Sequence, residues 1–492
     1  MSERNGLRYG LLGLALLILL ALLALVINRS TSSPTPTPAE STSIESLAAL
    51  GDQPPSRRDL NIQTWQTAEG AKVLFVEARE LPMFDLQLTF AAGSSHDDGT
   101  AGLAMLTNAM LNEGVPGKDV GAIAAGFENL GANFGNGAYR DMAIASLRSL
   151  SAADKREPAL QLFNQVLGQP TFPEDALARI KNQLLTGLEY QKQNPGKLAS
   201  LALFERLYGT HPYAHPSDGN AESIPAITRE QLQAFHAKAY TASNAIIALV
   251  GDLSRSDAEA LANQASAALP QGPALPRIAQ PETPEPGLQH IEFPSNQTHL
   301  MIAQLGIDRR DPDYAALYLG NQVFGGGGFG TRLMTEVREK RGLTYGVYSG
   351  FSAMQARGPF MINLQTRAEL SDGTLQLVKS MLADFIKDGP TSDELNNAKR
   401  ELAGSFPLST ASNAAIVGQL GSMGFYDLPL SYLEDFMRDV EALSVEQVKA
   451  AMAKHLNPDA LVIVTAGPSV AQKELPPPTD RPAEQPSGVP EH

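Results

Sequence analysis

The sequence predicts an α+β protein made of two homologous mixed α/β domains, preceded by one N-terminal transmembrane helix. Three observations support this fold class. A long apolar run lies near the N-terminus, and strand-like and helix-like segments occur in blocks through the remaining chain. Similar segments also recur about 210 residues apart, which indicates duplication of a whole domain rather than a solenoid.

The composition sets the class of protein. The chain has 492 residues, of which 43% are hydrophobic and 18% charged, so it can form sizeable buried cores. A net charge of −15 argues against nucleic acid as a partner, because phosphate binding needs a basic surface. The sequence has no cysteine, which excludes disulfides, a thiolate nucleophile, cysteine-ligated zinc and a lipid-modified cysteine anchor.

The apolar run extends from Gly10 to Ile27, about the minimum length of a transmembrane helix. It ends without a small-x-small cleavage site, so an uncleaved anchor is favoured over a cleaved signal or a buried soluble helix. Arg4 and Arg8 precede the run and Arg29 follows it, which leaves the N-terminus in the cytoplasm. We therefore expect a single-pass protein of the inner membrane, anchored in the lipid bilayer, with its body in the periplasm.

Segments rich in proline divide the chain. Ser30–Pro55, Pro270–Pro286 and the segment from Pro468 onward cannot bury enough apolar surface to fold alone, and indicate extended tethers or linkers. The predicted divisions are a cytoplasmic stub and anchor (1–29), a tether (30–56), a first domain (57–269), a linker (270–287), a second domain (288–467) and a tail (468–492).

Each predicted domain opens with two strand-like segments and continues with a turn, a helix and another strand region. Long helical stretches follow in both domains. The predicted strands are Lys72–Glu77, Phe84–Ala91, Gln289–Phe293 and His299–Leu305, and the clearest predicted helices are Glu174–Gln193 and Thr391–Gly404.

Over residues 59–467 the chain resembles the pitrilysin/insulinase family of inverted zinc peptidases. The most specific match is GGGGFGTRLMTEVREKRGLTYGVYS at residues 325–349, which is similar to the family's Gly-rich loop and Arg/Tyr signature. His211-Pro212-Tyr213 and the segment ITREQLQAFHAKAYTASNAIIALVGD at residues 227–252 match the end of the family's first domain. The resemblance implies a duplicated peptidase-like fold.

The family's zinc site is H-x-x-E-H on the first helix, with a further Glu about 77 residues beyond the second His. Positions i, i+3 and i+4 share one helix face, where two His bind zinc and the Glu serves as general base. Here those positions hold Met105, Asn108 and Ala109, and the third-ligand region at 186–187 lacks a carboxylate, with Glu189 the closest. The resemblance therefore implies a degenerate site with no metal and no cofactor in this chain.

No other histidine replaces the missing site. The sequence contains neither H-x-x-E-H nor H-E-x-x-H. His211 and His215 are four residues apart, but Pro212 and Pro216 favour a structural loop over a ligand-bearing helix. His96 is followed by two aspartates and is interpreted as part of a polar turn.

Arg338 and Tyr345 match the family's Arg/Tyr pair, which reaches across a closed chamber toward the zinc of the opposing domain and stabilises the oxyanion. Arg supplies a fixed charge and Tyr a hydroxyl donor. The structural alternatives are an Arg338 ion pair with Glu336 or Glu339 and a half-buried strand position for Tyr345. Arg341 is the competing arginine.

Gly325, Gly326, Gly327 and Gly328 could be mistaken for a phosphate-binding loop. The loop lacks the following Gly-Lys-Ser/Thr, and no dinucleotide-binding pattern surrounds it. We expect these glycines to form a flexible, substrate-binding edge of a peptide-binding cleft, because glycine lets a peptide backbone approach closely.

The leading hypothesis is a non-catalytic subunit that supplies Arg338 and Tyr345 in trans. Its partner would be a homologous subunit that carries H-x-x-E-H and zinc, and its substrate would be a peptide or an unfolded protein. The second hypothesis is a pseudopeptidase scaffold or peptide-binding module with no role in catalysis. An independent hydrolase with an unrecognised site is the third.

Overall fold

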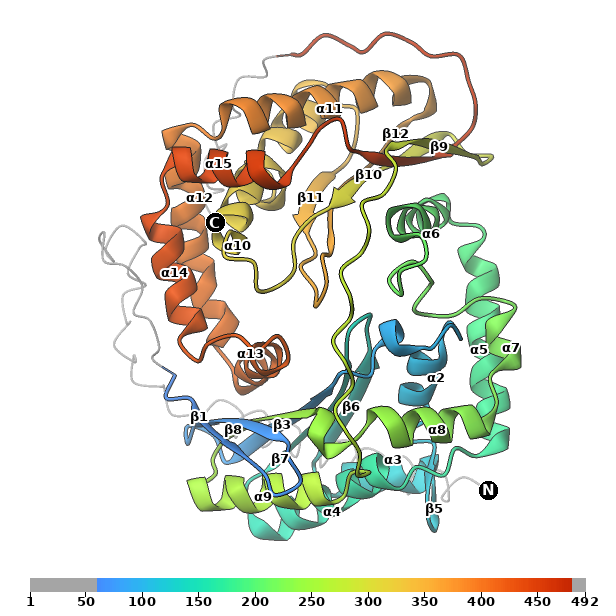
Figure 1. Cartoon of the computed structure of the whole chain (residues 1–492), viewed down its shortest axis with the longest axis vertical. Helices are drawn as coiled ribbons and strands as arrows, with labels where there is room; N and C mark the ends of the chain where they lie inside the picture. The colour runs from blue at the N-terminus through green and yellow to red at the C-terminus, as the bar shows by residue number, and fades with distance from the viewer. Residues whose placement is uncertain (1–59, 480–492) are drawn as a thin grey trace, which may run out of the picture. The chain divides into compact units, whose positions relative to one another are not determined.

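The computed structural model describes residues 60–479, and the predicted anchor and tether lie outside the described residues. None of the helices within residues 60–479 is long and apolar enough to cross a membrane. The described chain forms two mixed β-sheets with helices, as Figure 1 shows.

The first half of the described chain contains a six-stranded sheet and a two-stranded ribbon, β4–β5 (Gly114–Val115 and Lys118–Asp119). The sheet, in spatial order, consists of β1 (Gln63–Gln66), β2 (Lys72–Glu77), β8 (Ala245–Gly251), β3 (Met83–Phe90), β7 (Ala143–Leu150) and β6 (Asn133–Ala138). The helices are η2 (Ser94–His96), α2 (Leu103–Ala109), α3 (Val120–Asn129), α4 (Ala153–Gly168), α5 (Glu174–Gln191), α6 (Pro195–Tyr208), α7 (Ser223–Ala226), α8 (Arg229–Ala239), η3 (Ala242–Asn244) and α9 (Arg255–Ala267).

The second half contains a five-stranded sheet. In spatial order it consists of β11 (Val347–Phe351), β12 (Pro359–Arg367), β10 (Gln297–Leu305), β13 (Val462–Gly467) and β9 (Gly287–Glu292). The helices are α10 (Tyr314–Asn321), the π-helical η4 (Gln322–Gly326) and η5 (Met334–Lys340), η6 (Ala368–Leu370), α11 (Ser371–Asp388), α12 (Ser392–Ser405), η7 (Phe406–Thr410), α13 (Asn413–Phe425), α14 (Tyr432–Ala442) and α15 (Val445–His455).

The two sheets share one topology. In the first, β2 runs parallel to β8, and β3, β7 and β6 follow as antiparallel neighbours. In the second, β9 runs parallel to β13, and β10, β12 and β11 follow in the same way. The predicted α+β class with two similar halves is therefore confirmed.

The strands and helices predicted from the sequence lie close to their observed bounds. β2 covers Lys72–Glu77 as predicted, and β3, β9 and β10 each include most of the predicted strand. The predicted helices correspond to α5 and α12, within two residues at each end. Helix ends commonly vary by this amount because terminal turns fray.

Each half covers one face of the other half's sheet with a helix. Helix α13 packs on β8 and β3 of the first sheet, and α6 packs on β13 and β10 of the second (Figure 1). On α13, Ile416, Val417 and Leu420 join a buried cluster with Leu74 and Val250 of the first sheet. Strands buried on both faces are nearly continuous in apolar residues, as β8 (AIIALVG) illustrates.

Close approach at these contacts depends on small residues. A Cβ added at Gly424 of α13 would lie 2.3 Å from Ile246 Cγ2 of β8. The second helix, α6, contributes Leu203 and Leu207 to a buried cluster with Val462 and Val464 of β13. Because α13 packs on the first sheet and α6 packs on the second, the two halves share two apolar cores.

A buried polar network also joins the halves. Asp141, 4% exposed, accepts hydrogen bonds from the Tyr213 hydroxyl and from the Gln355 N–H at 2.7 Å. The Tyr213 hydroxyl oxygen in turn accepts from the Ala356 N–H at 3.1 Å. Thus the His211-Pro212-Tyr213 segment, which belongs to the first half, fixes the loop between β11 and β12 of the second half.

Candidate functional site

Helix α2, which carries the predicted degenerate zinc-site positions, begins near a buried carboxylate. Asp97, fully buried, accepts hydrogen bonds from the Gly102 N–H at 2.9 Å and from the Ala104 N–H at 2.6 Å. These donors are free at a helix N-terminus, so the carboxylate satisfies them. Burial nevertheless raises the pKa of Asp97 to about 7, against the opposing effect of those N–H groups.

Asn108, which the resemblance assigns to the general-base position, is held by buried hydrogen bonds. It is 2% exposed, and its amide Nδ2 donates to the Tyr240 hydroxyl oxygen at 3.2 Å and to the Ile144 carbonyl at 3.4 Å. The Asn136 amide of β6 donates to the Asn108 carbonyl at 2.6 Å. Burial raises the pKa of Tyr240, which keeps its hydroxyl protonated. The side chain thus connects α2 to β7 and α8's end instead of facing a reactant.

The other degenerate positions offer no zinc ligands. Met105 and Ala109 are half-buried, and neither has a nitrogen or carboxylate oxygen in its side chain. In the third-ligand region, the Thr186 hydroxyl donates to the Asn182 carbonyl at 2.8 Å, and Glu189 is ion-paired with Lys192 at 2.6 Å. These side chains do not fit a zinc ion.

A group of potential metal ligands does occur in the described chain, but at a different place. Asp311, Asp313 and His455 lie close together at the start of α10 and the end of α15. Asp313 Oδ2 is already bound by Lys454 Nζ at 2.6 Å and by His455 Nε2 at 2.8 Å. This cluster lies in the second half of the chain and does not include any predicted site residue.

Strand β6, which contacts α2, is an edge strand of the first sheet. The Tyr139 N–H donates to the Met142 carbonyl at 2.7 Å, so alternation along the antiparallel pair directs the backbone groups of Phe134, Asn136 and Ala138 away from β7. Within residues 60–479 no strand pairs with this side of β6. The outward backbone groups of β6 therefore have no strand partner among the described residues.

Arg338 and Tyr345 do not adopt the structural alternatives considered from the sequence. The Arg338 guanidinium lies 4.6 Å from the ring centre of Phe329, whereas Glu336 pairs with Lys340 and Arg341. Tyr345 is 83% exposed and precedes β11. Tyr345 and the 65% exposed Phe329 lie at the surface of the described chain, and Arg338 is half-buried.

Three of the four predicted substrate-binding glycines are needed by the fold itself. Added Cβ atoms at Gly325, Gly326 and Gly327 would lie 2.5 Å from Ser349 Oγ, 2.4 Å from Asn321 Nδ2 and 2.6 Å from the Gln322 carbonyl, respectively. Gly328 differs, because its added Cβ would meet no atom and its φ is +85°. The first three therefore allow η4 to pack closely, and Gly328 permits a left-handed turn.

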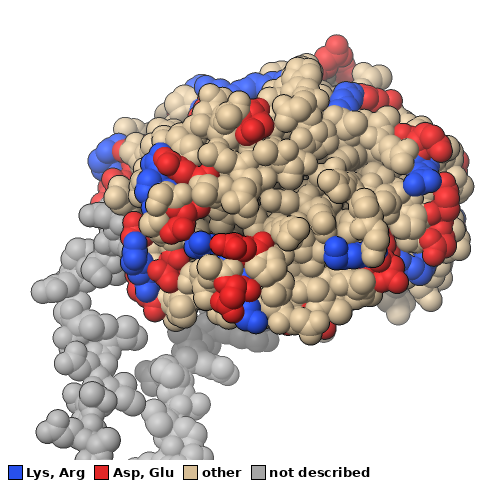
Figure 2. Space-filling model, turned by 90° about the horizontal axis from the view of Figure 1, so that it is seen from below, with Lys and Arg blue, Asp and Glu red and all other residues tan. Residues whose placement is uncertain are grey.

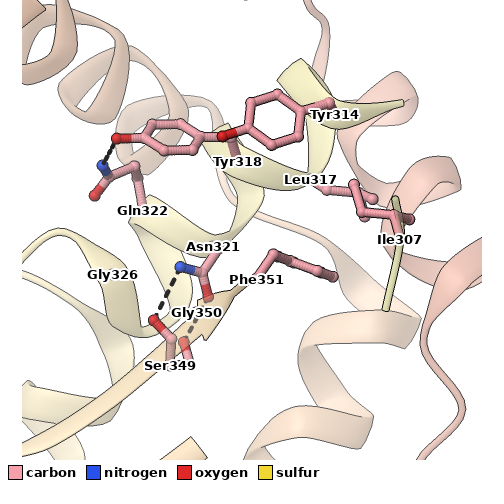
Figure 3. A pocket seen from close by; sticks show the side chains of 10 residues that line it. All are labelled: Ile307, Tyr314, Leu317, Tyr318, Asn321, Gln322, Gly326, Ser349, Gly350 and Phe351. Carbon is pink, nitrogen blue, oxygen red and sulfur yellow. Dashed lines mark hydrogen bonds between the residues drawn. The ribbon is translucent and has the colours of Figure 1, made fainter. Parts of the chain in front are cut away.

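A pocket of about 170 Å³ opens between α10 and β11, and sequence analysis did not identify it (Figure 3). Figure 3 shows Asn321 and Ser349 facing each other in it, with Asn321 Nδ2 donating to the Ser349 carbonyl at 3.0 Å and Ser349 Oγ donating to Asn321 Oδ1 at 2.6 Å. The remaining wall consists mainly of apolar and aromatic side chains, including Leu317, Tyr318 and Phe351, together with Gln322. Asn321 thus donates a hydrogen bond to a carbonyl on the unpaired side of the edge strand β11.

The second-half pocket had a faint signal in the sequence. Asn321 stands on the first α-helix after β9 and β10 of its half, as Asn108 stands on the first α-helix after β2 and β3. Because the two sheets share one topology, the position of Asn108 in the first half points to Asn321 as the comparable residue in the second half. This correspondence between Asn108 and Asn321 could be recognised only after the pairing of the strands was known.

The charge distribution also bears on partners. On the face shown in Figure 2, basic and acidic side chains are interspersed around an uncharged central area. Nucleic-acid-binding surfaces instead concentrate Lys and Arg on one face. This face gives no support to a nucleic-acid partner.

The chain is similar in sequence to known proteins. A model of the insulinase family, peptidase family M16, matches residues 72–218, and a model of the peptidase M16 inactive domain matches residues 226–402. The chain is 29% identical over 405 residues to the non-peptidase homolog YmxG of Helicobacter pylori, covering 80% of this chain and 91% of the relative. It is 22% identical over 409 residues to an uncharacterized zinc protease of Bacillus subtilis, covering 83% and 98%.

Solved structures are similar over most of the described chain. A crystal structure of a peptidase M16 inactive domain from Pseudomonas fluorescens has 75% identity and a TM-score of 0.83, covering 85% of this chain and 100% of that one. A protease from Helicobacter pylori has 16% identity and a TM-score of 0.77, covering 83% and 100%, which shows the fold alone.

Proposed function

The chain belongs to peptidase family M16, the insulinase family, and we propose that it is a non-peptidase member that binds extended peptide segments without cleaving them. One observation carries the proposal. Asn108 stands where the general base would be, and its amide is committed to Tyr240 and Ile144, while the β6 edge beside it stays open. The similarity to a relative named a non-peptidase homolog supports the same role.

Binding at β6 follows from strand geometry. A peptide added to an edge strand gains main-chain hydrogen bonds, and pockets for alternate side chains supply selectivity. The outward backbone groups of Phe134, Asn136 and Ala138 are suitable for this, and Asn136 is exposed. The comparable edge in the second half is less open, because Asn321 occupies the Ser349 carbonyl. The ligand class is therefore an extended peptide or an unfolded protein segment.

The test is a matched pair of variants at Ala138. Ala138→Pro removes one outward N–H, whereas Ala138→Ser keeps the N–H and a small side chain. Affinity of the purified full chain for a fluorescein-labelled unfolded peptide would be measured by anisotropy, with mass spectrometry of the peptide afterwards. We expect about tenfold weaker binding for Ala138→Pro, unchanged binding for Ala138→Ser, and an intact peptide. Equal affinity in all three proteins, or a cleaved peptide, would contradict the proposal.

A second candidate function is that of a non-catalytic subunit of a heteromeric zinc peptidase. The observation in its favour is that Tyr345 is exposed, while Arg338 is half-buried against Phe329 and makes no ion pair with Glu336. In this role the partner would be a homologous subunit with H-x-x-E-H and zinc, and this chain would donate to the developing oxyanion. A membrane anchor at Gly10–Ile27 and a periplasmic body remain predictions in both roles.

This candidate is tested by Tyr345→Phe and Arg338→Ala in a purified complex with such a partner. Loss of one oxyanion donor costs ~3 kcal/mol, so each variant should lower kcat by roughly 150-fold with little change in substrate binding. Leu408→Ala, at a residue 70% exposed, is the matched surface control. Full activity of both variants in an intact complex would leave only the peptide-binding role.

A further inference from the structure

The chain continues past the last strand without helix or strand but remains bound to the second half. From Ser469 to Thr479 it follows the outside of that half, seen in red in Figure 1. The Ser469 hydroxyl donates to Glu292 Oε2 of β9 at 2.6 Å, and the Lys473 N–H donates to the Glu369 carbonyl at 2.7 Å. We refer to Ser469–Thr479 as the C-terminal strap.

The middle of the strap is attached to α11. Gln472 Oε1 accepts a hydrogen bond from the Asp372 N–H at 3.1 Å, and its Nε2 donates to the Ala368 carbonyl at 3.1 Å. Leu475 is half-buried against the second core. A Cβ added at Gly373 would lie 2.8 Å from Leu475 Cγ, so the helix surface has room for this leucine only because residue 373 is glycine.

The end of the strap meets the end of η5. The last carbonyls of a helix have no partner within it, and here the Lys340 carbonyl accepts from the Thr479 N–H and the Thr479 hydroxyl, both at 2.9 Å. Arg341 Nη1 donates to the Pro476 carbonyl at 3.0 Å, and Arg341 Nε donates to Glu336 at 3.0 Å. The arginine considered as an alternative to Arg338 is therefore committed to the strap.

We propose that the C-terminal strap is a positioning device that fixes the C-terminal end of η5 and thereby the placement of Arg338 and Tyr345. Arg338 lies two residues before Lys340, and Tyr345 lies in the loop that starts at Arg341. Since the Tyr345 side chain is 83% exposed, its position depends on where that loop is held. The inference concerns a segment distinct from β6, so it stands independently of peptide binding there.

The first test is a matched pair at Thr479. Thr479→Pro removes both donors to the Lys340 carbonyl, whereas Thr479→Ser retains both. The readouts are tryptic cleavage after Lys340 and Arg341 and amide hydrogen exchange over residues 334–346. We expect both rates to rise by about tenfold in Thr479→Pro and to stay at the wild-type level in Thr479→Ser, because local opening limits both processes.

The second test is a pair of shortened chains. A chain that stops after Pro468 lacks the strap, and one that stops after Thr479 keeps every contact described above. The first should show the faster cleavage and exchange, and the second should match the full chain. Wild-type rates in both Thr479→Pro and the Pro468 chain would overturn the proposal. Exchange that rises equally throughout both halves would also overturn it, because the strap would then only stabilise the fold as a whole.

Discussion

At the scale of single residues, Asn108 makes buried side-chain hydrogen bonds at the position that the family resemblance assigns to the general base. Asn108→Ala removes the amide that reaches the Tyr240 hydroxyl, whose residue is fully buried. An unsatisfied buried hydroxyl costs ~1–3 kcal/mol, so we expect the free energy of unfolding to fall by that amount. The measurement is urea unfolding.

The matched control for this prediction is Tyr240→Phe, which removes the hydroxyl and leaves Asn108 bonded to Ile144. If the two side chains act as a pair, the double variant should lose less stability than the two single variants added together. Strict additivity would show that the Asn108–Tyr240 contact contributes nothing.

The same residues make a prediction about metal content. Met105, Asn108 and Ala109 do not fit zinc, so the chain purified from zinc-supplemented cells should contain far less than one ion per chain. Chelation should leave its urea midpoint unchanged, since a metal bound only to the folded state would stabilise it. Elemental analysis that finds close to one retained zinc would refute the degenerate site.

At the scale of secondary-structure elements, α12 is joined to the start of η5 by one ion pair. Arg332 Nε and Nη2 each donate to Glu394 at 2.7 Å, and the guanidinium also reaches the Gly389 carbonyl at 2.9 Å. This pairing lowers the pKa of Glu394 from its ordinary 4.5 to about 2. The stabilisation is therefore complete above pH 4.5 and is lost as the pH falls toward 2.

Glu394→Gln should accordingly be less stable than the wild type above pH 5, and the gap should narrow between pH 4.5 and 3. Thermal unfolding at a series of pH values measures it. Glu401→Gln, on an exposed residue of the same helix, is the control and should track the wild type. A gap that does not change with pH would mean that the ion pair adds no stability.

At the scale of the whole described chain, each half packs one helix, α6 or α13, on the sheet of the other half. We therefore expect the two halves to unfold together. Trp65 of β1 is the only tryptophan and reports on the first half. Phe385 is fully buried in the second core and stacks on Phe324, with 5.1 Å between the centres of the two rings. Phe385→Ala should cost ~3–5 kcal/mol and move the Trp65 fluorescence transition to lower urea, although the two residues lie in different halves.

The surface variant Leu408→Ala, 70% exposed, should leave the Trp65 transition in place. If the two halves unfolded independently, Phe385→Ala would destabilise only the second half. Circular dichroism would then show a separate transition at lower urea, and the Trp65 transition would stay unchanged.

The sequence alone determined the features that depend on short separations or on composition. β2 and α5 follow from local apolar patterns, and the duplicated order of strands and helices is visible as a repeat. The prediction of a degenerate zinc site is equally local, because Met105, Asn108 and Ala109 share one helix face. Such patterns depend only on which side chains are apolar and which lack an atom that can bind a metal. They can therefore be recognised without knowing which residues meet in the folded chain.

Tertiary structure decided everything that joins residues far apart in the chain. Asn108 meets Tyr240, Tyr213 meets Ala356, and Thr479 meets Lys340 only after folding. A proline-rich composition indicates that the segment after Pro468 makes no helix or strand, but it cannot say what surface that segment lies on. The physical reason is that a hydrogen bond requires two groups within about 3 Å, and a single sequence specifies such proximity only between near neighbours.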